Sequence, residues 1–155
     1  MEIFHAITEY LTAHNVKFTT LHHEETRTSE ASAQARGESI VIGGKAIVIK
    51  IENEFKLFVL SAALKIDSKK IKEHFHAKTI RFATPEELLS LTGLVPGSVP
   101  PFGEPILNLA LYVDSSIQRN EKIAFNAGSL TDSIIMKTED YLRVACPEIF
   151  DFGKR

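Results

Sequence analysis

Lys45 is the residue whose type and position most favour chemistry in this sequence. It stands directly before a strongly β-forming run, Ala46-Ile47-Val48-Ile49, which would hold its ammonium group at the mouth of a strand. A lysine ammonium is a compact hydrogen-bond donor suited to a carbonyl oxygen or a phosphate. A solvent-facing edge charge is the ordinary role of such a lysine, and the residues alone leave both roles open.

The segment from Thr92 to Pro105 is the second candidate, because three glycines and four prolines interrupt all regular structure there. Long irregular loops in compact domains usually carry function. Backbone N–H groups at Gly97, Ser98 and Gly103 could form a cradle for an oxyanion or an ester, since glycine permits close approach. A rigid connection between two elements is the alternative.

Other catalytic motifs fail on their spacing. Gly43-Gly44-Lys45 is not a phosphate-binding P-loop, because Ser39 stands where a glycine is needed and Ala46 where Ser or Thr is needed. His22-His23 are adjacent in a strand and point to opposite faces, so they do not form a ligand pair for zinc. No G-x-S-x-G motif occurs. The sequence therefore predicts a site without a metal or a cofactor.

The elements that must position these residues are indicated by hydrophobic periodicity, caps and turn signals. Helices are predicted up to about Asn15, over 29–36, from the N-cap Asp67 to Phe75, over 85–91 and after Thr138. Strands are predicted over 18–22, 46–51, 55–62, 79–83, 107–113, 122–127 and 133–136. Several strands are joined by hairpin-sized turns, so we expect one α+β domain over 1–155, with a mixed, largely antiparallel sheet and helices packed outside.

The overall charge limits the kind of partner. Net charge is −2 and the pI about 6.3, so a nucleic-acid contact should be local rather than spread over the surface. Positive charge gathers in one place, which is either a solvated helix face or a docking strip for a phosphate backbone: Lys65, Lys69, Lys70, Lys72 and Lys78. With one cysteine, no signal peptide and no membrane-spanning run, we expect a cytoplasmic protein.

The order of these features resembles the YbaK and prolyl-tRNA synthetase-associated editing domain family. In that family a lysine that starts an apolar strand faces a Thr-Gly loop containing a glycine, three residues and a proline. Lys45 and the loop Thr92–Gly103 follow this order, and Gly97 and Pro101 match the spacing. The resemblance runs over about 140 residues and implies the family's barrel-like α+β fold.

Further positions fall in the family's order, and two depart from its pattern. Asp114 closes a strand, and Gly128-Ser129 precede another. Ala46 stands where members often carry Thr or Ser, and Pro96 where many have glycine. These differences bear on the substrate more than on the fold.

The resemblance implies hydrolysis of the ester that joins a wrong amino acid to the 3′ end of a tRNA. Lys45 would hold the aminoacyl ester or the terminal phosphate, and a ribose hydroxyl of the substrate would activate the water. The loop would wall the amino-acid pocket, with Val99 and Phe102 setting its size. The substrate-binding residues implied in this way are Gly97, Ser98, Val99, Pro101, Phe102, Gly103, Asp114, Gly128 and Ser129.

Expected partners are the 3′ end of an aminoacyl-tRNA and an aminoacyl-tRNA synthetase, with no membrane and no metal. An apolar pocket separates substrates that differ by one methylene by only ~1–3 kcal/mol, so a second sieve is useful for small amino acids. Ala, Cys or Ser on tRNA-Pro or a related tRNA is therefore expected.

The residues leave two alternatives open. A non-catalytic module of the same fold would bind a small molecule, and Ala46 and Pro96 are the residues that would favour it. A factor that depends on a partner would instead dock its lysine-rich helix on a tRNA or a synthetase, with strong dependence on salt.

Overall fold

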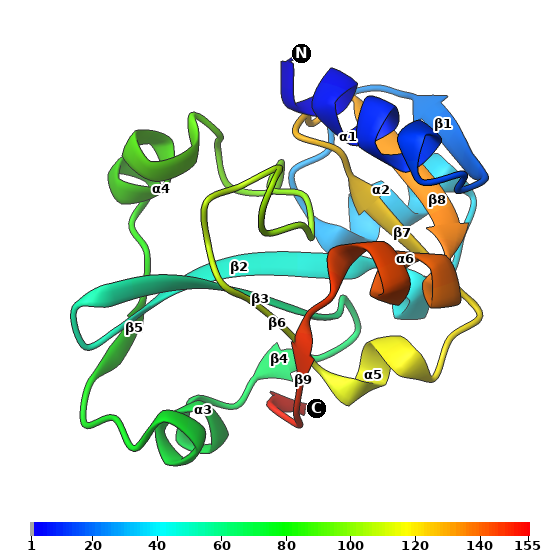
Figure 1. Cartoon of the computed structure of the whole chain (residues 1–155). Coiled ribbons are helices and arrows are strands. Elements are labelled where there is room, and N and C mark those ends of the chain that lie inside the picture. The colour runs from blue at the N-terminus through cyan, green and yellow to red at the C-terminus, as the bar shows by residue number, and fades with distance from the viewer. Residues whose placement is uncertain (1) are drawn as a thin grey trace.

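The computed structural model describes residues 2–155, in which short helices and strands alternate along the chain (Figure 1). The helices are α1 Glu2–Ala13, α2 Ser29–Arg36, α3 Ser68–Phe75, α4 Pro85–Thr92, α5 Ser115–Gln118 and α6 Thr138–Ala145, with a single 3-10 turn, η1, at Ile40–Ile42. The strands are β1 Phe18–His22, β2 Gly44–Ile51, β3 Glu54–Ser61, β4 Lys65–Ile66, β5 Ile80–Phe82, β6 Leu111–Val113, β7 Lys122–Asn126, β8 Asp132–Lys137, β9 Glu148–Ile149 and β10 Gly153–Lys154.

The strands form two sheets and a short ladder. The larger sheet has the order β5-β2-β3-β6-β9, with antiparallel pairing around β2 and parallel pairing of β3 with β6 and of β6 with β9. The order β1-β8-β7 forms an antiparallel sheet, and β4 pairs with β10. This confirms the α+β class with a mixed, largely antiparallel sheet.

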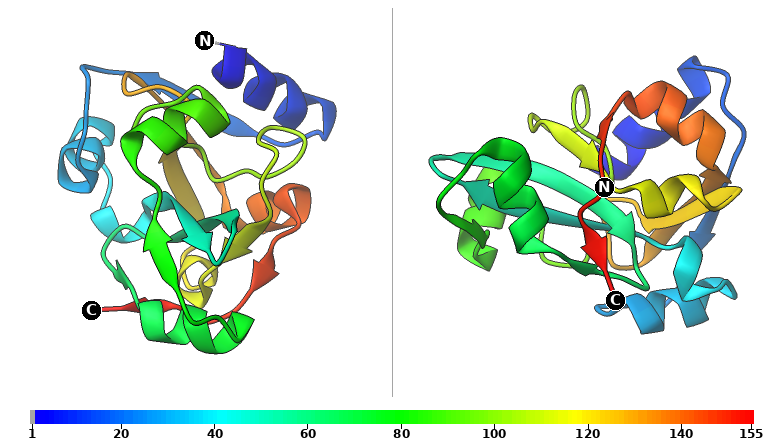
Figure 2. Two further views of the ribbon diagram at one scale, coloured as in Figure 1. Left: turned by 90° about the vertical axis from the view of Figure 1, so that its left-hand side faces the viewer. Right: turned by 90° about the horizontal axis from the view of Figure 1, so that it is seen from below.

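The expected barrel-like closure is wrong, because the larger sheet ends at two short edge strands. β5 pairs only with Ile49–Ile51 of β2, and β9 contributes two residues to the opposite edge. The long β2–β3 hairpin crosses the molecule, with α3 and α4 at one end and α1 and the β1-β8-β7 sheet at the other (Figures 1 and 2).

The hairpin forms because its two strands are rich in β-branched and aromatic residues around a tight turn. Ile51 pairs with Glu54, and Glu52 between them takes a positive φ of 53°. Alternate side chains of β3 enter two apolar clusters on opposite faces of the sheet: Leu57 and Val59 one, Phe58 and Leu60 the other. The sheet is therefore buried on both faces where the hairpin crosses the core.

The bounds predicted from cap residues for α2 and α4 agree closely with those in the structure. The Thr84 hydroxyl accepts from the Glu87 N–H, and the Glu87 carboxylate accepts from the Thr84 N–H, which completes the predicted capping box of α4. The predicted helix over 29–36 also begins and ends as expected, with Thr28 as N-cap and Gly37 in the left-handed region.

One predicted strand is shorter than expected. β6 covers only Leu111–Val113, whereas the apolar run predicted a strand from Leu107. The N–H groups of Ile106 and Leu107 both donate to the Gly103 carbonyl, at 2.9 and 3.0 Å, so this part of the run turns back on the loop instead of joining the sheet. Among the described residues, no helix has the length and apolar character needed to cross a membrane.

Candidate functional site

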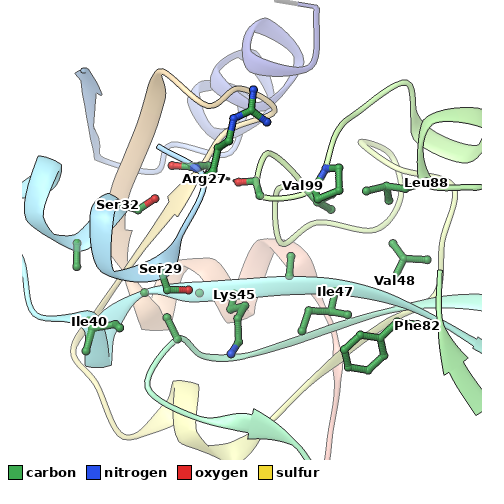
Figure 3. Close-up of a pocket in the computed structure, with 18 of the residues that line it drawn as sticks. Arg27, Ser29, Ser32, Ile40, Lys45, Ile47, Val48, Phe82, Leu88 and Val99 are labelled. Carbon is green, nitrogen blue, oxygen red and sulfur yellow. Dashed lines mark hydrogen bonds between the residues drawn. The ribbon is translucent and has the colours of Figure 1, made fainter. Parts of the chain in front are cut away.

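A cavity of about 320 Å³ lies beside the first half of β2 (Figure 3). Its walls come from α2, the start of β2, the turn from β5 to α4, and the loop at 96–99. Its lining consists of Arg27, Ser29, Ser32, Ala33, Arg36, Ile40, Gly43, Gly44, Lys45, Ala46, Ile47, Val48, Ala62, Phe82, Ala83, Leu88, Pro96, Gly97, Val99 and Asn126. This volume is near the lower end of the range for small-molecule sites.

The cavity exists because one edge of β2 is left open. β5 pairs with β2 only as far as Ile49, and the Ala83 N–H then donates to the Val48 carbonyl at 3.0 Å. The direction of backbone N–H and C=O groups alternates along a strand, so those of Ala46 point toward the same open edge. The cavity is therefore lined by strand backbone as well as by side chains.

The charge of the lining is entirely positive. Arg36 and Lys45 contribute cations, whereas the guanidinium of Arg27 pairs with Glu25 at 3.1 Å and points away from the cavity in Figure 3. Among the residues that the structure describes, no aspartate or glutamate lines the cavity. The remaining wall is largely apolar, with Leu88 and Val99 both buried. Such a cavity suits a ligand that combines an anionic or carbonyl group with a small side chain.

The Lys45 ammonium is held by the protein itself. Its Nζ donates to the Leu64 carbonyl at 2.5 Å, and Figure 3 shows the side chain pointing away from Val99. Burial lowers the pKa of Lys45 below its usual value, Glu30 nearby raises it, and Lys65 lowers it further. The hydrogen bond to Leu64 uses one of three donors, which leaves two for a ligand.

Arg36 is fixed by a buried network. Its Nε donates to Ser133 Oγ at 2.9 Å and its Nη2 to Asn126 Oδ1 at 3.0 Å, while His23 Nε2 lies 2.8 Å from the same Ser133 oxygen. Burial lowers the pKa of Arg36 to about 10. The guanidinium therefore enters the cavity in a set orientation and remains a cation at neutral pH.

The loop at 96–99 is tied to this network. Asn126 Nδ2 donates to the Gly97 carbonyl at 2.9 Å, and Gly97 has a positive φ of 89°. The Ser98 hydroxyl donates to the Val95 carbonyl at 2.8 Å, and the Gly128 N–H donates to the Ser98 carbonyl at 2.9 Å. Asn126 thus connects the position of the loop to the position of Arg36.

The residues expected in the site divide into two groups. Lys45, Gly97 and Val99 line the cavity together, whereas Ser98, Pro101, Phe102 and Gly103 lie behind it and are buried.

Phe102 does not face the cavity, contrary to the expectation that it sets the size of the pocket. It is 2% exposed and packs edge-on against Phe125 and Tyr141, at ring-centre distances of 5.5 and 5.4 Å. The Tyr141 hydroxyl donates to the Pro101 carbonyl at 2.6 Å. An aromatic ring at this position gains more from the core than from the cavity wall.

Asp114 and Ser129 lie outside the cavity lining. Asp114 caps α5 and accepts from the N–H groups of Phe152 and Gly153, at 2.7 and 2.8 Å. Burial raises the pKa of Asp114, but these hydrogen bonds and those from Ser116 outweigh it and leave the pKa below its usual value. Ser129 donates to Asp132 at 2.9 Å in the turn before β8. Gly128 is also outside the cavity lining, and its N–H donates to the carbonyl of Ser98 in the loop at 96–99.

Sequence reasoning missed Arg27, Arg36, Phe82 and Asn126. Arg36 precedes the helix-ending Gly37 and looks like an ordinary charge in a last helical turn. Asn126 ends a strand that carries no polar pattern, and Phe82 looks like one more apolar strand residue. No signal in a single sequence separates these residues from structural ones.

The histidines have local partners instead of a shared one. His22 Nδ1 lies 2.9 Å from Asp132, and His74 Nε2 lies 2.7 Å from Glu148. Within residues 2–155, no group of three His, Cys, Asp or Glu side chains is placed to hold a metal ion.

Comparison with known proteins gives consistent similarities. The profile of a family described as "Aminoacyl-tRNA editing domain" matches residues 23–144. The chain is 36% identical over 150 residues to the multifunctional Ser/Thr-tRNA deacylase ProXp-y of Escherichia coli (strain K12), across 93% of this chain and 89% of that protein. It is 31% identical over 103 residues to the proline–tRNA ligase of Shouchella clausii (strain KSM-K16), across 66% of this chain and 18% of the ligase.

A solved structure shares the fold along the whole chain. It is that of a candidate trans-editing enzyme for prolyl tRNA synthetase, with a TM-score of 0.84 and 24% identity, covering 100% of this chain and 99% of that one.

Proposed function

Because the chain belongs to the aminoacyl-tRNA editing domain family, we propose that it is a deacylase that hydrolyses the ester of tRNA charged with serine or threonine. One observation carries the proposal. A small cavity combines cations from Lys45 and Arg36 with an apolar wall, and no carboxylate of the described residues lines it. That combination fits a terminal nucleotide and a small aminoacyl group.

The reaction would be direct hydrolysis of the ester. The oxygen of a water attacks the ester carbonyl carbon, the bond to the ribose oxygen breaks, and the proton of the water passes to that oxygen. The ester is already activated, so positioning and stabilisation of the developing negative charge are what the site must supply. One of the two unused donors of Lys45 and the backbone N–H of Ala46 would supply them, with a substrate hydroxyl activating the water. The other donor of Lys45 is left for the terminal phosphate.

The choice of amino acid rests on the relative and on the wall of the cavity. The relative at 36% identity is named for action on Ser- and Thr-tRNA. Here Ser29 and Ser32 line the cavity opposite the buried Leu88 and Val99, and the Ser32 hydroxyl lies 2.8 Å from Thr26 Oγ1. Serine and threonine side chains are small and carry a hydroxyl, so they match both walls. Serine was among the amino acids expected from the sequence.

The tRNA would extend from the cavity over the lysine-rich helix. Lys69, Lys70 and Lys72 on α3 are exposed, and none of them forms an ion pair with another described residue. Lys65 precedes α3 and lies close enough to affect the pKa of Lys45. A phosphate backbone leaving the cavity at Lys45 would meet these charges next. A tRNA charged by prolyl-tRNA synthetase or a related enzyme is the expected substrate.

The experiment is a panel of tRNAs charged with Ser, Thr, Ala, Cys and Pro, with loss of the ester followed over time. We expect rapid loss from Ser-tRNA and Thr-tRNA and slower loss from the others. Equal rates on all five, or rates equal to the uncatalysed loss, would refute the proposed substrate.

A binding module is the second candidate, and one contact favours it. Lys45 is engaged with the Leu64 carbonyl and points away from Val99. If the protein binds charged tRNA but leaves its ester intact for every amino acid in the panel, this contact is permanent and the module is the better account.

A further inference from the structure

Phe82 is an exposed aromatic ring at the mouth of the cavity. It is 52% exposed and lines the cavity beside Leu88. Five other large apolar residues in the described chain are comparably exposed, none of them is aromatic, and none lines the cavity: Val41, Leu89, Leu91, Val95 and Ile149. The exposure of Phe82 therefore coincides with the site.

The surrounding structure holds the backbone of Phe82 in place without burying its ring. Phe82 pairs with Ile49 across the sheet, and the Ala83 N–H donates to the Val48 carbonyl. Arg81 donates two hydrogen bonds to the Glu87 carboxylate, at 2.7 and 2.8 Å, and so ties the end of β5 to α4. None of these contacts uses the phenyl ring. The fold thus fixes the backbone of Phe82 and leaves its apolar ring open to solvent.

Phe82 lies on the same side of β2 as Lys45. Side chains alternate along a strand, so Lys45, Ile47 and Ile49 share one face, and Phe82 is opposite Ile49. Figure 3 shows Phe82 next to Ile47, with Lys45 farther along on that side. An aromatic ring, an aliphatic side chain and an ammonium group therefore follow one another along the rim of the cavity.

This sequence of groups matches the parts of one nucleotide. A planar base stacks on an aromatic face, a sugar packs on an aliphatic side chain, and a phosphate pairs with an ammonium group. We propose that Phe82 is the platform on which the 3′-terminal base of the charged tRNA stacks, with its phosphate at Lys45. The inference rests on the proposed function, because it identifies how the same site holds the end of the tRNA.

The test compares variants at Phe82 on two charged tRNAs. In Phe82→Ala and Phe82→Leu, we expect kcat/KM to fall by about 5- to 100-fold, the effect of removing one base–aromatic stack. The loss should be the same for Ser-tRNA and Thr-tRNA, since the base is common to both, and should lie mainly in KM. Phe82→Trp should keep most of the activity because it keeps a stacking face. Leu89→Ala, at an equally exposed site outside the cavity lining, should have no effect.

Binding of adenosine 5′-monophosphate gives a readout that needs no turnover. We expect its Kd, measured by NMR titration, to rise in Phe82→Ala, while the weaker binding of ribose 5-phosphate stays unchanged. If the wild-type protein hydrolyses no ester, the proposed function fails, but this titration still decides the role of Phe82.

Three results would contradict the proposed stacking of the terminal base on Phe82. The first is wild-type kcat/KM in Phe82→Ala. The second is a loss confined to one amino acid, which would make the ring a wall of the amino-acid pocket. The third is an AMP Kd that does not change when the ring is removed.

Discussion

Arg36 and Lys45 bring positive charge into the same cavity by different means. Arg36 is fixed by two hydrogen bonds to buried partners, Ser133 and Asn126. Lys45 makes one hydrogen bond, to a backbone carbonyl, at the end of a flexible side chain. Arg36 therefore acts as a fixed wall, and Lys45 is the cation that can follow a ligand.

Removing Arg36 should affect stability as well as activity. In Arg36→Met, Ser133 and Asn126 each lose a donor while remaining buried, so we expect unfolding free energy to fall by about 1–3 kcal/mol. Arg36→Lys should lose a similar amount of unfolding free energy, because one ammonium group cannot satisfy both partners in the geometry of the guanidinium. Urea unfolding measures both. Arg119→Met, at an exposed arginine, is the control, and an equal loss in that variant would contradict the role of the network.

Single residues show where sequence reasoning reached the site and where it stopped. Lys45, Gly97 and Val99 were expected in the site and do line the cavity, because strand starts and glycine loops leave visible patterns. Phe102 was expected to face the cavity and lies in the core, since sequence does not show which way a loop side chain points. Arg36 required the tertiary structure, because its partners are about 90 residues away in the chain.

The loop at 96–99 is an element whose shape depends on backbone conformation. Gly97 takes a φ of 89°, which L-residues with a side chain rarely adopt, and a Cβ there would lie 3.4 Å from Leu130 and 3.5 Å from the Arg27 carbonyl. Gly93, at the end of α4, has a similar φ of 74° but open space around it.

The pair Gly97→Ala and Gly93→Ala separates strain from function. Each should lower the unfolding free energy by about 1–2 kcal/mol because of the left-handed conformation. Only Gly97→Ala should also lower deacylation severalfold, since it moves the backbone that lines the cavity. Thermal unfolding and initial rates are measured on both variants. Full activity in Gly97→Ala would mean that the loop does not touch substrate.

Acid should weaken the pairing of Arg81 with Glu87, which joins the end of β5 to α4. The side-chain hydrogen bond from Arg81, with one from the Thr84 N–H, lowers the pKa of Glu87 to about 2. A carboxylate whose pKa is lowered by folding stabilises the fold fully above its unfolded pKa, about 4.3 for glutamate. This contribution is lost as the pH falls toward the pKa of the folded state. The difference in unfolding free energy between wild type and Glu87→Gln should therefore be constant above about pH 5 and shrink between about 4 and 2. A constant difference down to pH 2 would contradict the pairing.

Elements with several residues and clear caps were predictable, and very short ones were not. The bounds of α2 and α4 followed from caps, and the β2–β3 hairpin followed from its two β-rich runs. β9 and β10 have two residues each and owe their pairing to neighbours far away in the chain. No local pattern marks such strands.

For the whole molecule, charge is distributed unevenly despite the net value of −2. Arg36 and Lys45 line the cavity, and the exposed lysines of α3 follow Lys65 in the chain. Glu73 on the same helix and Asp67 at its N-cap reduce the local excess. The expectation that a nucleic-acid contact would be local, made from the low net charge, stays a prediction, and this region is where it would apply.

Changing Lys69, Lys70 and Lys72 together to Ala should weaken binding of tRNA and its dependence on salt. Each lost phosphate contact lowers the magnitude of the slope of log K against log salt by about 0.7–0.9, so the full triple change should lower it by about 2–3. The matched control is Lys17, Arg119 and Lys137 changed to Ala, all exposed and outside the cavity lining. Equal slopes for both triples would place the tRNA elsewhere.

The role of Lys45 in hydrolysis is tested by comparing kcat/KM of Lys45→Ala on Ser-tRNA with that of Lys50→Ala. Lys50 lies on the same strand, with its ammonium 5.6 Å from the centre of the Phe55 ring, and does not line the cavity. We predict a loss on the order of 10²–10³-fold for Lys45→Ala, comparable to removing a donor to a developing oxyanion, and none for Lys50→Ala. Equal activity in the two folded variants would contradict the claim that this cavity is where the ester is hydrolysed.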